Sequence, residues 1–156
     1  MLFRSRNIAR SDKVPENKNQ PRSVQTGDEV TEMGWEVYPK GMLETLGQVH
    51  FGYGFPAIYI TENGAAYKDI VDAGGNVQDT ARIDYLRRHL VEVRRAAQLG
   101  LPVRGYFAWS LLDNFEWALG TSKRFGLIHV DYSSQRRTIK ESGKWYRNVI
   151  ETNSVD

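Results

Sequence analysis

Residues 57–64, Ala-Ile-Tyr-Ile-Thr-Glu-Asn-Gly, contain the strand that decides the fold, and they end in a carboxylate and a turn glycine. Pro56 and Gly64 interrupt regular structure at the two ends, so we expect a short buried strand over residues 57–61. In parallel α/β folds the catalytic side chains gather at the carboxyl ends of strands, around an opening above the packed core. Glu62 has this position and is a candidate catalytic group, with a solvated carboxylate in a turn as the alternative.

The segments that follow this strand predict a βαβ unit. Apolar residues recur every three or four positions over residues 80–99, which predicts an amphipathic helix. Its apolar face comprises Ile83, Leu86, Leu90, Val93 and Ala97. The apolar and aromatic run over residues 103–110 predicts a second buried strand. Two strands joined through such a helix run parallel, with a right-handed crossover.

Four further segments complete the expected organisation. Residues 1–34 are polar and show no periodicity, which predicts a loop or a loosely held arm. Residues 39–49 predict a short helix, and residues 141–151 predict a closing helix. Residues 127–132 predict a further strand, in which we expect His129 to be a hydrogen-bonded structural histidine.

Such a unit is incomplete as a domain. Two parallel strands with one crossover leave both faces and both edges of the sheet in need of partners. The sequence therefore predicts a part of a larger α/β structure.

The composition excludes several classes of protein and site. The 156 residues are 40% hydrophobic, which is sufficient for a packed core, and the formal net charge is only +2. Basic and acidic residues are interleaved over most of the chain, so no nucleic-acid partner is expected. No apolar run reaches the length of about 18 residues that spans a membrane, so no membrane partner is expected either. There is no cysteine, and the three histidines show no metal-ligand spacing, so we expect neither a metal nor another cofactor.

The loop after the second strand is rich in side chains that suit a sugar. It contains Trp109, Ser110, Asp113, Asn114, Phe115, Glu116 and Trp117, followed by Arg124, Phe125 and Gly126. Aromatic faces pack against the apolar C–H faces of a sugar ring, while carboxylates and amides bind its hydroxyls. Core packing of the aromatic residues is the alternative, and so are solvated or helix-capping roles for Asp113 and Glu116.

Glu62 and Glu116 follow neighbouring strands and form a candidate catalytic pair. Glycoside hydrolysis commonly needs two carboxyl groups, one that protonates the leaving group and one that acts as nucleophile or base. The spacing in the sequence does not assign these roles.

Four long motifs in this chain point to one enzyme family. They are MGWEVYPKG at 33–41, YITENGAAY at 59–67, RGYFAWSLLDNFEWALG at 104–120 and SKRFGLIHVDY at 122–132. In this order they closely resemble the C-terminal third of glycoside hydrolase family 1, the retaining β-glucosidases and their relatives. The resemblance implies an α/β fold, namely a partial TIM (β/α)8 barrel that carries the seventh and eighth strand–helix units over residues 35–152. Residues 1–34 would then precede it at a truncated start, and residues 153–156 would form a tail.

The resemblance also implies roles for five residues. Glu62 matches the catalytic nucleophile, which attacks the anomeric carbon to give a covalent glycosyl-enzyme that water then hydrolyses. Trp109, Glu116 and Trp117 match residues that hold the glycone sugar, and Phe125 matches an aromatic wall of the same subsite. The family pattern therefore moves Glu116 from the role of acid to that of sugar ligand.

One departure from the family pattern decides what we expect of the chain alone. The family's acid/base glutamate lies in a Thr-Phe-Asn-Glu-Pro motif, and no Asn-Glu-Pro occurs here, so we expect an essentially inactive fragment. Its expected partner is the missing N-terminal barrel segment, its expected substrate a β-glucoside or cellobiose-like glycoside, and its expected location the bacterial cytoplasm. A non-catalytic carbohydrate-binding protein and a barrel-assembly fragment are the alternatives.

Overall fold

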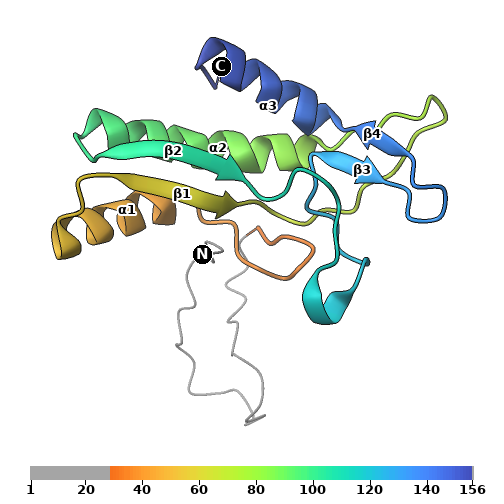
Figure 1. The fold of residues 1–156 in the computed structure, drawn as a ribbon, viewed down its shortest axis with the longest axis horizontal. Helices are drawn as coiled ribbons and strands as arrows, with labels where there is room; N and C mark the ends of the chain where they lie inside the picture. The colour runs from red at the N-terminus through yellow and green to blue at the C-terminus, as the bar shows by residue number, and fades with distance from the viewer. Residues whose placement is uncertain (1–28, 156) are drawn as a thin grey trace, which may run out of the picture.

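The computed structural model describes residues 29–155 (Figure 1). Most of the arm predicted for residues 1–34 lies outside this range. Within it, Val30 forms an isolated antiparallel bridge with Glu36, so residues 30–36 make a closed turn before the first helix. The division of the chain at residues 34 and 152 stays a prediction.

The predicted βαβ unit is confirmed. Strand β1 (Ile58–Asn63) pairs in parallel with strand β2 (Val103–Ala108), and helix α2 (Thr80–Gln98) connects them. In Figure 1 the two strands lie side by side and point in the same direction, toward the loops and the hairpin. Strand β1 continues to Asn63, two residues beyond the predicted end, so Glu62 is the penultimate residue of the strand.

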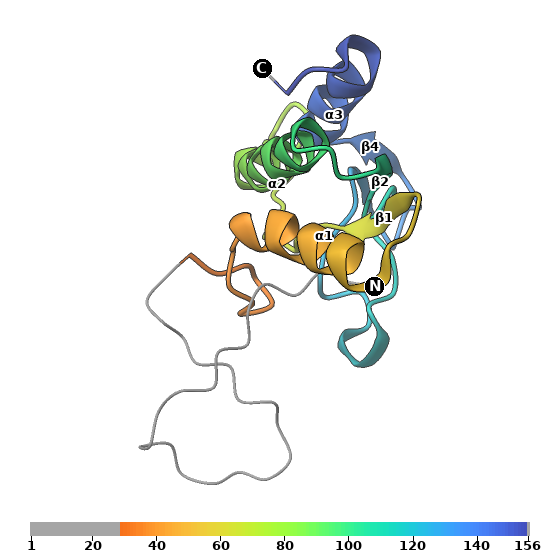
Figure 2. The ribbon, with the colours of Figure 1, turned by 90° about the vertical axis from the view of Figure 1, so that its left-hand side faces the viewer.

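Helices α1 and α2 cover one face of the two strands (Figure 2). Helix α1 (Lys40–Tyr53) is one turn longer than predicted and ends at Gly54, whose φ of 65° suits a glycine at this position. Apolar side chains of these elements form one core cluster, comprising Met42, Leu46, Ile60, Ala96 and Leu101. A second cluster, nearer the strand tips, comprises Val37, Ala65, Tyr85, Leu86 and Leu127.

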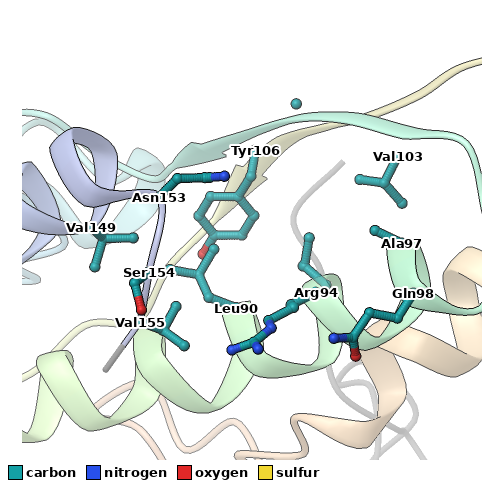
Figure 3. Close-up of a pocket in the computed structure, with 12 residues that line it drawn as sticks. Leu90, Arg94, Ala97, Gln98, Val103, Tyr106, Val149, Asn153, Ser154 and Val155 are labelled. Atoms are coloured by element: carbon teal, nitrogen blue, oxygen red, sulfur yellow. The ribbon is translucent and has the colours of Figure 1, made fainter.

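The predicted apolar face of helix α2 is buried only in part: Leu86 is in the core and Val93 packs against the core. The residues buried on this helix are Arg82, Tyr85, Leu86, His89 and Ala96. Leu90 and Ala97, from the same predicted face, line an open groove of about 600 Å³ between α2, β2 and the C-terminal residues (Figure 3). The amphipathic pattern misled because an arginine and a histidine, which usually face solvent, are buried here with polar partners.

The C-terminal part forms a hairpin and a helix. Strand β3 (Ile128–Val130) lies inside the strand predicted over residues 127–132, and it pairs antiparallel with β4 (Arg137–Ile139), which the sequence did not predict. Helix α3 (Glu141–Thr152) matches the predicted closing helix. A short 3₁₀ turn, η1 (Trp117–Leu119), lies in the loop after β2. Among the described residues, no helix combines the length and the apolar character that crossing a bilayer requires.

The other face of the two-stranded sheet is open to solvent in the described part of the chain. Tyr59 and Phe107 are each 58% exposed there, and their rings flank the position that a side chain on Gly105 would take. Within residues 29–155, β1 and β2 each have one hydrogen-bonded edge and one free edge. Exposed aromatic residues beside free strand edges form a surface that is open to contact with further structure.

We expect acid to destabilise the fold through His89, which is fully buried on α2. Its Nδ1 donates to the backbone oxygen of Tyr85 at 2.7 Å, and its Nε2 is buried without a partner among the described residues. Burial lowers the pKa of His89 from 6.5 to about 4, so between these pH values the unfolded chain binds a proton that the folded chain does not. Stability therefore falls as the pH drops from 7 to 4, by about 3 kcal/mol from this side chain.

Urea denaturation at both pH values measures this loss. The wild type should lose about 3 kcal/mol more than His89→Gln, and the control variant His50→Gln should behave as the wild type. Equal losses in the wild type and in His89→Gln would contradict this assignment.

Candidate active site

The tips of β1 and β2 are joined, which brings the two candidate loops together. The backbone nitrogen of Trp109 donates to the carbonyl of Asn63 at 2.8 Å, one residue beyond the end of β2. Gly64 follows at such close range that a Cβ on it would lie 1.7 Å from the backbone oxygen of Trp109. Only a glycine allows this approach. Gly64 therefore positions the loop that follows Glu62.

Glu62 and Glu116 share one environment at these strand tips. Glu62 is half-buried near the end of β1, and Glu116 is only 7% exposed at the start of η1. Burial, together with the nearby charge of Glu62, raises the pKa of Glu116 above its ordinary value. The structure therefore brings together the two carboxylates that the sequence predicted as a pair.

The alternative of a solvated or helix-capping acid is wrong for both candidates in the second loop, Glu116 and Asp113. Glu116 is buried and makes no side-chain cap bond to η1, although it precedes that turn. Asp113 is 4% exposed and pairs with Lys140 and Arg124. A buried acid of this kind is held in one place, either to bind a ligand or to connect loops.

The aromatic residues of the second loop differ in exposure. The indole nitrogen of Trp109 is buried and has no hydrogen-bond partner among residues 29–155, so its donor is unsatisfied in the described part of the chain. Trp117 is 81% exposed and offers a free ring face. Phe125 is only 1% exposed and lies 6.2 Å from the ring of Trp35, so its predicted contact with a sugar stays a prediction.

A polar network supports the tip of β1, and the sequence did not reveal it. The Asn63 amide nitrogen donates to the Tyr85 hydroxyl at 3.1 Å, and the Tyr106 hydroxyl donates to the Asn63 amide oxygen at 2.7 Å. Burial raises the pKa of Tyr106 well above its ordinary value, so this hydroxyl stays protonated and acts as a donor. Tyr106 lies on β2, next to β1, so the predicted strand pairing could have placed it near Asn63. Tyr85 lies on α2, and nothing in the local sequence predicts its contact with Asn63.

The described residues contain no group of three or more histidine, cysteine, aspartate or glutamate side chains arranged to hold a metal ion. The chemistry available here is that of carboxylates, an indole donor and aromatic faces. Such a set binds hydroxyls and apolar ring faces, and a half-buried carboxylate beside a bound sugar can attack its anomeric carbon.

Comparison with known proteins identifies the family. The sequence model of Glycosyl hydrolase family 1 matches residues 3–155. The chain is 57% identical over 125 residues to the 1,4-beta-D-glucan glucohydrolase of Thermotoga neapolitana, and 53% identical over 126 residues to Beta-glucosidase A of Thermotoga maritima. These matches cover 80% and 81% of this chain, but 28% of each relative. The chain thus spans less than a third of the length of these relatives.

Solved structures agree with the sequence matches. The Family 1 b-glucosidase from Thermotoga maritima superposes with a TM-score of 0.84 at 51% identity, over 85% of this chain and 30% of that one. The Beta-glucosidase from Thermotoga maritima has also been solved in complex with deoxynojirimycin, with the same superposition. The fold is therefore part of a TIM barrel, and the chain belongs to glycosyl hydrolase family 1.

Proposed function

We propose that this chain is the C-terminal part of a retaining β-glucosidase, with Glu62 as the catalytic nucleophile. The observation that carries the proposal is the position of Glu62 at the tip of β1, where the bond from Trp109 to Asn63 joins two parallel strands. Catalytic groups of TIM-barrel enzymes lie at this end of the strands. In this proposal β1 and β2 are the seventh and eighth barrel strands.

Each residue of the site has a task in this reaction. Glu62 attacks the anomeric carbon of a β-glucoside, the aglycone leaves, and water hydrolyses the glycosyl-enzyme ester in a second step. Glu116 accepts hydrogen bonds from sugar hydroxyls far from the anomeric carbon, and the Trp109 indole donates to another hydroxyl. Trp117 packs against the apolar face of the ring, and Phe125 belongs to the wall of the same subsite.

The group that protonates the leaving aglycone is not in this chain, because the sequence contains no Asn-Glu-Pro. We therefore propose that the N-terminal barrel segment supplies it, and that this segment covers the free strand edges and the exposed rings of Tyr59 and Phe107. A bacterial cytoplasmic location and a glucoside or cellobiose-like substrate complete the proposal.

The purified 156-residue chain should not hydrolyse an aryl β-glucoside above the background rate. Loss of a general acid alone lowers the rate by about 10² to 10⁴, and loss of most of the barrel removes the positioning of the substrate as well. The release of nitrophenol from a nitrophenyl β-glucoside measures this directly. Turnover that Glu62→Gln abolishes would contradict the inactivity of the isolated chain.

Sugar binding without chemistry is the competing function, and the unpartnered Trp109 indole and the exposed Trp117 ring favour it. A binding protein would be supported if Trp117→Ala weakens the binding of glucose while Glu62→Ala leaves it unchanged. In that case a barrel completed with the N-terminal segment of a relative would show no turnover.

A further inference from the structure

A cluster of six charges, five of them buried and one partly exposed, lies between the two loops of the site. It comprises Asp69, Asp79, Arg82, Asp113, Arg124 and Lys140. The side chains of Asp69, Asp113 and Lys140 are 0% exposed. Three carboxylates face three cations, so the cluster is neutral as a whole. Buried charges persist only where partners compensate them, and each member here has at least one.

Lys140 joins the two loops directly. Its Nζ donates to Oδ2 of Asp69 and, at 2.7 Å, to Oδ1 of Asp113. Asp69 lies in the loop that follows Glu62, and Asp113 lies in the loop that contains Glu116. Lys140 itself immediately precedes α3, so a third element holds both loops at once.

Asp113 closes the base of the second loop. It accepts hydrogen bonds from the backbone nitrogens of Gly126 at 2.9 Å and Val130 at 3.3 Å, and from the Arg124 guanidinium at 2.6 Å. Although burial alone would raise the pKa of Asp113, Lys140 and Arg124 lower it below its ordinary value. The carboxylate therefore stays charged and keeps these bonds.

Asp69 is anchored equally well in the first loop. The Arg82 guanidinium binds both of its oxygens, at 2.9 and 3.1 Å, in the forked geometry typical of arginine and carboxylate. The same guanidinium donates to the backbone oxygen of Arg124 at 2.8 Å. Both loops are thus fixed to the same set of side chains, and Lys140 is the group that connects their carboxylates.

We infer that Lys140 is a positioning residue of the glycoside site, which holds the loop after Glu62 against the loop of Glu116 and thereby sets the separation of the two carboxylates. The inference rests on the proposed function for the importance of that separation. If Glu116 binds hydroxyls while Glu62 attacks the anomeric carbon, a shift of about 1 Å between them costs on the order of 10²-fold in rate.

The charge of Glu62 raises the pKa of Glu116, and this coupling reports the separation. It is measured as the change in the Glu116 pKa caused by Glu62→Gln, by NMR titration of the carboxyl carbons in the 156-residue chain. We expect Lys140→Met to reduce this change by at least half. The control Lys144→Met removes an exposed lysine that pairs with Glu141, and it should leave the change as it is.

An unchanged coupling in Lys140→Met, together with a lower free energy of unfolding, would overturn the inference and leave Lys140 a purely structural residue. If Lys140→Met does not fold, the pair Asp69→Asn with Lys140→Met is measured instead, because it removes one charge of each sign, and the same criterion applies. The titration involves no sugar. An inactive completed barrel would therefore reject the proposed function without affecting this result.

Discussion

In a completed barrel, Glu62→Gln should lower kcat for an aryl β-glucoside by on the order of 10⁴ or more, the scale on which loss of a covalent nucleophile acts. The barrel is completed by replacing the matching segment of the Thermotoga maritima Beta-glucosidase A, to which this chain is 53% identical, with residues 29–156. The amide keeps the size of the side chain but cannot attack the anomeric carbon. Steady-state kinetics on the purified chimera measure the effect.

The matched control is Glu151→Gln, which neutralises an exposed glutamate that pairs with Arg147 on the surface of α3. Its kcat should equal that of the unmodified chimera, because surface ion pairs contribute little. A loss of less than tenfold in Glu62→Gln would remove Glu62 from the catalytic step.

The second large effect concerns Gly64, at which alanine should destabilise the fold by about 3 kcal/mol or more. The added Cβ would lie 1.7 Å from the oxygen and 2.8 Å from the carbon of the Trp109 carbonyl. Both atoms belong to the backbone, so the strand tips must separate, and the 2.8 Å bond from the Trp109 nitrogen to Asn63 is lost. Urea denaturation of the chain measures the change.

Gly47→Ala provides a control of opposite sign. Gly47 lies inside α1, and a Cβ there meets no heavy atom within 4 Å. Alanine should therefore stabilise the chain by about 0.5 to 1 kcal/mol through its higher helix propensity. A Gly64→Ala variant as stable as the wild type would show that the strand tips tolerate separation.

Local patterns in the sequence were sufficient to predict the βαβ unit. The strand at residues 57–61 is an apolar run between Pro56 and Gly64, and the strand at residues 103–110 is an apolar and aromatic run. The helix between them is long and strongly periodic. Strand β4 escaped prediction because it has only three residues, Arg137–Ile139, two of them polar. Its partner β3 pairs with it only in the folded hairpin, which the local sequence does not encode.

The site shows the same division between local and tertiary information. Glu62 and Glu116 were predicted because each follows a strand, and parallel strands end at the same edge. Lys140 and Arg82 were missed because a buried cation in sequence looks like any solvated one until its carboxylate partners are known. The burial of Arg82 also explains why the buried residues of α2 match its predicted apolar face only in part.

Trapping of the covalent intermediate tests the assignment of Glu62 most directly. The completed barrel is incubated with a 2-deoxy-2-fluoro-β-glucoside that carries a dinitrophenolate leaving group. The fluorine slows hydrolysis of the glycosyl-enzyme, so the intermediate accumulates. The labelled peptide is then identified by mass spectrometry. We predict one fluoroglucosyl group, on Glu62, and none in Glu62→Gln. A label on Glu116, or turnover of ordinary glucosides with no label on Glu62, would contradict the account.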